Sequence, residues 1–147
     1  SLNGMEIRGG RLTTEPVWDD TDIGHIVRSQ IVIGNHQVNS GLRLESKPTE
    51  SLVVKLLGGN AGFTANGRQL DIADRIGGSL YIMGQPGFPV VLTSLNDDSV
   101  PVGFDPNGLP IFDTNNNGTT TLPAGGDWTR KRSIGSACPR RLHAGCN

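Results

Sequence analysis

The chain has 147 residues, which is the length of a single domain. Its 21 glycines and 9 prolines, with only 5% aromatic residues, argue against a mainly helical protein. The net charge of −1 hides an asymmetry, because residues 1–128 carry 8 basic and 14 acidic side chains, whereas residues 129–147 carry 5 basic side chains and no acidic one. An acidic body suits divalent cations and argues against nucleic acid as a partner.

We therefore divide the chain into a folded domain, residues 1–128, and a basic tail, residues 129–147, which we expect to be disordered. Cys138 and Cys146 both lie in the tail, where they could close one small loop, but no further pair makes a disulfide framework and no Cys-x-x-Cys pair exists. No apolar run is long enough to span a membrane, and no signal peptide is present. Because the chain begins at Ser1, we interpret it as a fragment of a longer exported protein.

Short apolar segments separated by Gly, Asn and Pro turns follow one another roughly every ten residues. In chain order, the sequence predicts strands at residues 5–8, 25–33, 42–45, 51–57, 63–65, 70–72, 79–83 and 89–95. Two all-β architectures fit this pattern: a solenoid, in which each strand stacks on the next coil, and a β-sandwich. Leu52-Val53-Val54 and Val90-Val91-Leu92 are continuous apolar runs, which are typical of parallel sheets buried on both faces and favour the solenoid.

The stretch from Asp97 to Trp128 is rich in Asp, Asn, Gly and Pro, and directly follows the most strand-like run of the chain. Within it, Asp113, Asn115 and Asn117 alternate before Gly118, which is the oxygen-ligand spacing of a calcium loop. A loop of this length inside a folded domain usually has a function, and ion binding is one such function. The alternative is a series of Asn-Gly and Asp-Pro turns without an ion.

The match to a calcium loop is partial. An EF-hand carries a bidentate Glu at its twelfth position, where this chain has Ala124, and Pro110 and Pro123 are incompatible with the two flanking helices. We therefore predict a free-standing Ca²⁺ loop whose missing carboxylate comes from Asp97, Asp98 or Asp127. The full set of predicted metal ligands is Asp97, Asp98, Asp105, Asn107, Asp113, Asn115, Asn117 and Asp127.

Three segments carry a resemblance to a known class of proteins. The run Pro-Val-Val-Leu-Thr-Ser-Leu-Asn-Asp-Asp at 89–98, the loop Asp-Thr-Asn-Asn-Asn-Gly at 113–118 and the run Pro-Ala-Gly-Gly-Asp-Trp at 123–128 resemble a signature of bacterial right-handed parallel β-helix proteins. Residues 18–23 also look like an inter-coil element of these proteins, so that the resemblance covers roughly residues 4–128. It implies a secreted or cell-surface protein of a functionally mixed class that includes adhesin-like segments and, more distantly, calcium-using polysaccharide lyases.

The chain departs from this pattern at two places. After Trp128 the family continues with an apolar strand, whereas this chain reads Thr129-Arg130-Lys131-Arg132. Pro101 also stands where such chains usually have a small flexible residue. The first departure implies that the last coil has no cap, and an exposed edge at that end would favour a homodimer.

Catalytic residues are harder to assign. There is no Gly-x-Ser-x-Gly motif, and the three histidines lack the spacing of a zinc hydrolase. One cluster combines three carboxylates, Asp19, Asp20 and Asp22, with the imidazole of His25, and these groups could hold a metal and a general base. The simpler interpretation, which we favour, is that they form a turn between coils.

These observations leave three functional hypotheses. The first is a calcium-held segment of a surface protein with a structural or binding role, taking a carbohydrate or small-molecule ligand. The second is a Ca²⁺-dependent hydrolase of a small ester or lactone, such as an acyl-homoserine lactone, in which the ion polarises a carbonyl and activates water. The third is a domain similar to polysaccharide lyases.

Overall fold

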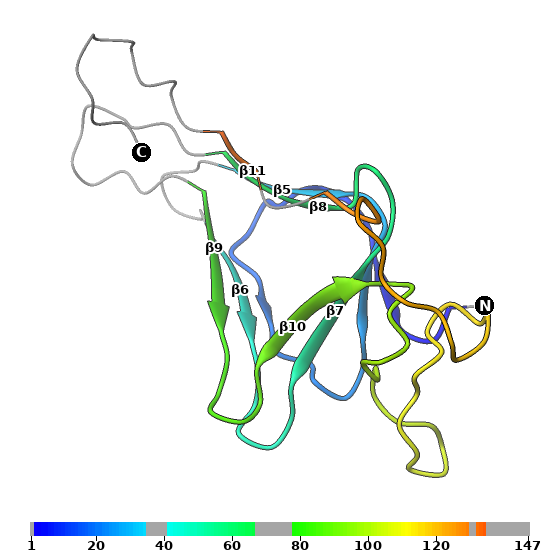
Figure 1. The fold of residues 1–147 in the computed structure, drawn as a ribbon. Coiled ribbons are helices and arrows are strands. Elements are labelled where there is room, and N and C mark those ends of the chain that lie inside the picture. Colours follow the sequence, from blue (N-terminus) through cyan, green and yellow to red (C-terminus); the bar gives the residue numbers. More distant parts are fainter. Residues whose placement is uncertain (1, 35–40, 67–77, 130–131, 135–147) are drawn as a thin grey trace, which may run out of the picture.

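The computed structural model describes residues 2–34, 41–66, 78–129 and 132–134 (Figure 1). These residues form strands, turns and extended segments and contain no helix, so no helix in the described ranges could cross a membrane. The strands are β1 (Met5–Ile7), β2 (Gly10–Arg11), β3 (Val17–Trp18), β4 (His25–Val27), β5 (Gln30–Ile33), β6 (Gly41–Glu45), β7 (Leu52–Leu56), β8 (Gly62–Asn66), β9 (Ser79–Met83), β10 (Val90–Ser94) and β11 (Arg132–Ile134).

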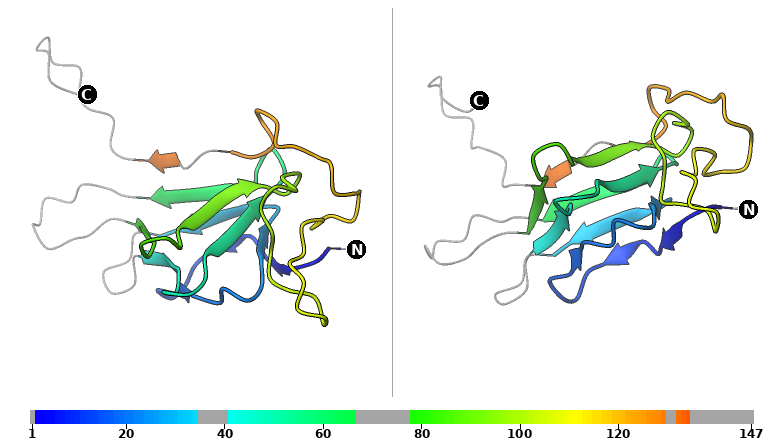
Figure 2. Two further views of the ribbon diagram at one scale, coloured as in Figure 1. Left: turned by 60° about the horizontal axis from the view of Figure 1, so that its bottom comes forward. Right: turned by 90° about the horizontal axis from the view of Figure 1, so that it is seen from below.

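The strands form three parallel sheets, which lie like the three sides of a triangle in Figure 1. Sheet A has the order β1-β4-β7-β10, sheet B has the order β2-β5-β8-β11, and sheet C has the order β3-β6-β9. The chain thus visits the three sheets in turn, and each strand from β1 to β8 pairs in parallel with the strand that follows three places later (Figure 2). The all-β class and the parallel sheets predicted from the apolar runs are confirmed, and the antiparallel sheets of a β-sandwich do not occur among the described strands.

The core lies between the three sheets, and each sheet contributes the inward half of its alternating side chains. On β7, Leu52, Val54 and Leu56 point inward and are fully buried, and Leu42 and Leu44 on β6 face them from sheet C. Because the strands pair in register, equivalent positions form rows along the stacking direction, such as Val90 beside Leu52. The two continuous apolar runs of the sequence are therefore neighbouring strands of one sheet.

The predicted strand at 25–33 is divided by a corner. β4 belongs to sheet A and β5 to sheet B, and Arg28 and Ser29 between them are exposed. The sequence also did not predict the two-residue strands β2 and β3, which are too short to show any periodicity. The predicted strand at 70–72 and both cysteines lie outside the described residues.

Strand β11 lies within the segment that the sequence analysis separated as a tail. It pairs in parallel with β8, so the paired strands extend to residue 134. No described strand pairs with the outer edge of β9, where Tyr81, Ile82 and Met83 are 41–49% exposed. A homodimer at this end of the sheets stays a prediction.

Candidate functional site

Between β10 and β11 the chain makes its longest described excursion, Leu95–Thr129, which we call the connection. It folds back across the outer face of sheet A and reaches the first strands, as the yellow and orange segments of Figures 1 and 2 show. At its far point the amide N–H of Asn3 donates to the carbonyl oxygen of Thr114 at 2.8 Å. Since the core covers the inner face and the connection the outer face, all five residues of β7 are buried.

Lys55, the fourth residue of β7, joins the connection to the sheet. Its side chain points outward and has no exposed surface. The ammonium group donates to the carbonyl oxygen of Asp97 and to the hydroxyl oxygen of Thr114, both at 2.7 Å. One buried side chain thereby holds the two ends of the segment 97–114.

The electrostatics around Lys55 follow from burial and from nearby carboxylates. Burial lowers the pKa of Lys55, and the negative charges of Asp97, Asp98 and Asp113 oppose this effect. Burial acts on the Asp97 carboxyl in the opposite direction, but hydrogen bonds from Ser99 and Thr93 outweigh it, so its pKa lies below the ordinary value. Lys55 therefore places a positive charge among three of the carboxylates that the sequence analysis assigned to Ca²⁺.

The connection also approaches the first circuit of strands closely. Val102 is buried, and its side chain lies where a Cβ on Gly24 would stand. Gly103 has a φ of +68°, and a Cβ there would collide with the backbone oxygen of Asp22. Glycine is required at position 103 both by its backbone conformation and by this contact.

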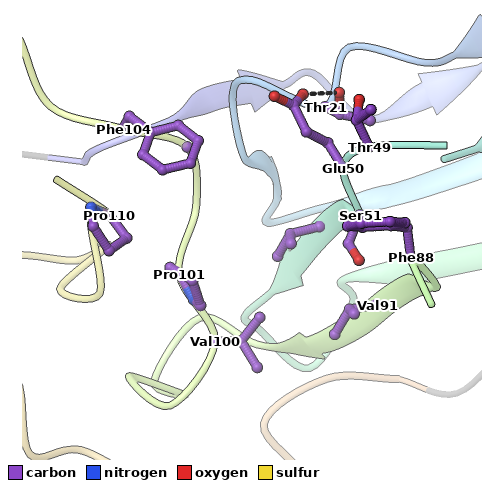
Figure 3. Close-up of a pocket in the computed structure, with 12 residues that line it drawn as sticks. Thr21, Thr49, Glu50, Ser51, Phe88, Val91, Val100, Pro101, Phe104 and Pro110 are labelled. Carbon is purple, nitrogen blue, oxygen red and sulfur yellow. Dashed lines mark hydrogen bonds between the residues drawn. The ribbon is translucent and has the colours of Figure 1, made fainter. Parts of the chain in front are cut away.

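A pocket of about 330 Å³ lies between the connection and sheet A (Figure 3). Val53 and Val91, which are neighbours in register on β7 and β10, form its floor. The residues from the connection that line it are Val100, Pro101, Gly103, Phe104 and Pro110. The remaining lining residues come from the corner that precedes sheet A, namely Thr21, Thr49, Glu50, Ser51 and Phe88.

The polar end of the pocket is built from stacked turns. Residues 47–50 and 85–88 form two tight turns, each closed by backbone hydrogen bonds between its first and last residue. Ser46 lies between them, because its hydroxyl donates to the carbonyl oxygen of Phe88 and accepts from the N–H of Gln85. Glu50 and Phe88 thus occupy equivalent places in successive turns, and the hydroxyl of Thr21 donates to Glu50 Oε2 at 2.5 Å.

No motif in the sequence marks Thr21, Glu50 or Phe88 as part of a site. A signal for them exists, because Pro48 and Pro86 stand 38 residues apart in similar turns, each shortly before a strand of sheet A. Strands β6 and β9 begin at the same separation. A search for internal repeats at this period would have paired Glu50 with Phe88.

The predicted calcium ligands are dispersed along the connection and are used locally. Asp105 Oδ1 accepts from the N–H groups of Asn107 and Leu109, and the hydrogen bond from Leu109 is the main reason why its pKa lies below the ordinary value. The Asp113 carboxylate accepts from the N–H groups of Asn117 and Gly118 in the same manner. Both carboxylates therefore close turns.

The remaining predicted ligands form two groups near the ends of the connection. Asp127 Oδ2 accepts from Ser94 and Ala124, and its pKa is lowered chiefly by the Ser94 hydroxyl. Asn115 reaches Asn96, whereas Asp98 Oδ2 accepts from the N–H and hydroxyl of Thr121. Two buried oxygens, Asp98 Oδ1 and Asn115 Oδ1, accept no hydrogen bond.

In the described ranges, no three His, Cys, Asp or Glu side chains are arranged to hold a metal ion. Asp97, Asp98, Asp105, Asp113 and Asp127 therefore contribute to no such group in the described ranges, and the Ca²⁺ site stays a prediction. The two buried oxygens without a partner, Asp98 Oδ1 and Asn115 Oδ1, have the hard-donor chemistry that Ca²⁺ requires.

The four catalytic candidates are placed differently from one another. Asp19, Asp20 and Asp22 are exposed, whereas His25 is 2% exposed and stacks on Trp18 with 5.3 Å between ring centroids. Burial lowers the pKa of His25, and the charge of Asp20 opposes this effect. His25 packs as a neutral ring against the core, which agrees with the interpretation of the cluster as a turn between strands.

A comparison of the chain with known protein families, with curated protein sequences and with solved structures found no match.

Proposed function

We propose that this chain is a segment of a right-handed parallel β-helix from a secreted or cell-surface bacterial protein, and that it has a binding role. The triangular arrangement of the sheets and the pairing of each strand from β1 to β8 with the third strand after it support the β-helix. The secreted or surface location follows from the resemblance at residues 89–98, 113–118 and 123–128.

One observation carries the binding role: the connection folds back over sheet A and leaves a pocket between the two. A connection that only linked β10 to β11 would not need 35 residues, since β4 and β5 are linked by two. The pocket lies at the lower end of the usual volume range of ligand sites, about 300–1,000 Å³, and is lined mostly by apolar groups with a few polar ones at one end. A carbohydrate or another small molecule is the class of ligand that suits this volume.

The binding role is tested by screening small carbohydrates and small organic molecules for ligand-induced chemical-shift changes. Val91→Phe places a larger side chain on the pocket floor, and Val17→Phe, at an exposed position on β3, is its matched control. We expect ligands that bind the wild type and the control but not Val91→Phe. A screen in which every binder ignores Val91→Phe would contradict the binding role.

Calcium is a separate part of the proposal. Bound Ca²⁺ would neutralise the carboxylates at the start of the connection, and Asp98 Oδ1 and Asn115 Oδ1 are the oxygens left for it. The ammonium group of Lys55 already supplies positive charge to these carboxylates, which reduces the need for a bound Ca²⁺. The proposal is therefore best tested by variants that separate buried from turn-forming carboxylates.

We expect a higher melting temperature in saturating Ca²⁺ than in excess chelator. Asp98→Asn should remove this difference, whereas Asp105→Asn, which alters a carboxylate bonded only within its own turn, should retain it. Equal melting temperatures of the wild type in Ca²⁺ and in chelator would end the calcium proposal and leave the binding role intact. The hydrolase and lyase hypotheses stay predictions, because no arrangement of the described residues favours either one.

A further inference from the structure

The pocket between the connection and sheet A has one charged end and an otherwise mostly apolar lining, which limits the class of ligand that it can bind. Of its twelve lining residues, Glu50 alone is charged. Its Oε2 accepts the hydroxyl of Thr21, and no hydrogen bond from another described side chain reaches its Oε1. A carboxylate oxygen therefore remains available as an acceptor at the polar end of the pocket.

Most of the other lining residues are apolar. Val53, Val91 and Val100 supply aliphatic surface, and Phe88 and Phe104 supply aromatic rings on either side of it, as Figure 3 shows. Phe104 is 58% exposed although it belongs to a pocket wall, which leaves apolar area for a ligand to cover. Aromatic faces attract cations as well as apolar groups.

We propose that this pocket binds a small amine, with its apolar body against Val53, Val91 and the phenylalanine rings and its ammonium group at Glu50. The inference rests on the binding role proposed above and specifies the ligand for it. An anionic ligand would be repelled by Glu50. A sugar would leave most of its hydroxyl groups against apolar side chains, and each such group loses hydrogen bonds to water without replacement.

The fold itself fixes the position of the Glu50 carboxylate in the pocket. The backbone hydrogen bonds between Lys47 and Glu50 fix the turn, and Thr21 from the preceding circuit orients the carboxylate. The equivalent place in the next turn is Phe88. Stacking therefore sets a carboxylate and an aromatic ring side by side along one corner, which is a suitable arrangement for an alkylammonium group.

The test compares three probes of similar shape: 2-phenylethylamine, 2-phenylethanol and 3-phenylpropionate. Dissociation constants are measured on the full chain by chemical-shift titration. We expect the amine to bind at least about tenfold more tightly than the alcohol, because a hydrogen bond to a charged group is stronger than a neutral one, and the acid to bind most weakly. Equal affinities for the amine and the alcohol would overturn the proposal.

Two variants locate the effect. Glu50→Gln keeps the shape of the side chain and should lower the affinity for the amine about tenfold, while the affinity for the alcohol stays unchanged. Glu6→Gln makes the same charge change outside the pocket and should leave both affinities unchanged. Val91→Phe should weaken both probes. An amine whose affinity is the same in Glu50→Gln as in the wild type would overturn the proposal.

The same chemistry is found in free amines and in the amino terminus of a polypeptide. Titration with the amide of phenylalanyl-glycyl-glycine separates these sources, since binding stronger than that of 2-phenylethylamine indicates a polypeptide and weaker binding a free amine. A different result would be that neutral ligands bind as well as amines and that Val91→Phe blocks them. This result would contradict the assignment of an amine but would support the binding role.

Discussion

The two faces of sheet A are buried in different ways. The inner face packs into a core of aliphatic side chains, where Leu52, Val54 and Leu56 meet the leucines of β6. The outer face is covered by the connection through a small number of specific contacts, of which the hydrogen bonds of Lys55 and the close approach at Gly103 are the clearest. The inner face thus depends on the amount of apolar surface, and the outer face on individual groups.

This difference predicts how each face responds to substitution. Removing atoms from the inner face should lower global stability, because the core is shared by all three sheets. Removing a contact from the outer face should loosen the connection and the pocket first, with the sheets remaining folded.

The largest effect is expected on the inner face. Leu44→Ala removes a fully buried side chain and should lower the free energy of unfolding by about 2–5 kcal/mol, measured by denaturant unfolding. Val17→Ala, at a 46% exposed position on the same sheet, should cost less than about 0.5 kcal/mol. Similar losses in the two variants would mean that the core is not where the three sheets place it.

The next largest effect is expected at Lys55. Lys55→Met retains most of the side-chain length but leaves the Asp97 carbonyl and the Thr114 hydroxyl without their donor. We therefore expect the free energy of unfolding to fall by about 1.5–3 kcal/mol. Lys47→Met, at an exposed turn position, is the matched control. Protease cleavage should become faster within residues 97–114 in Lys55→Met, and an unchanged cleavage rate would show that Lys55 does not hold the connection.

Substitutions at Gly103 and Gly108 distinguish the effect of a close contact from the effect of backbone strain. Both have positive φ, +68° and +78°, but only a Cβ at Gly103 meets another part of the chain. Gly103→Ala should therefore lower the free energy of unfolding by about 1–3 kcal/mol more than Gly108→Ala does. Equal losses in denaturant unfolding would mean that the connection does not pack against Asp22.

The smallest effect concerns His25 and pH. Because burial holds the pKa of His25 below its ordinary value of 6.5, the unfolded chain binds a proton first as the pH falls. The contribution of His25 to stability is therefore present above pH 6.5 and is lost as the pH falls from 6.5 toward the folded-state pKa.

His25→Phe should reduce the loss of melting temperature between neutral pH and about pH 5. Asp20→Asn should enlarge that loss, since the charge of Asp20 supports the protonated imidazole. A His25→Phe protein with the pH dependence of the wild type would contradict the assignment of a neutral buried ring.

The sequence alone determined the class of fold and much of the inner face. Glycine and proline turns between short β-branched runs predicted strands, and the continuous runs at 52–54 and 90–92 predicted a parallel sheet buried on both sides. These features are local, because alternation and turn chemistry depend on residues close together in the chain. The corner at Arg28 and Ser29 escaped prediction, since the two flanking strands differ in sheet but not in composition.

The tertiary structure decided the outer face. Asp113 begins the spacing of a calcium loop and Asp105 is a further predicted ligand, and in the fold the carboxylate of each accepts N–H groups of its own turn. Lys55 is a charged residue within an apolar run, and the sequence does not show which groups it binds. Its hydrogen-bond partners lie 42 and 59 residues further along the chain. The pocket likewise joins Thr21, Glu50 and Phe88 from successive circuits, because contacts between stacked strands depend on register, and register is set by the whole fold.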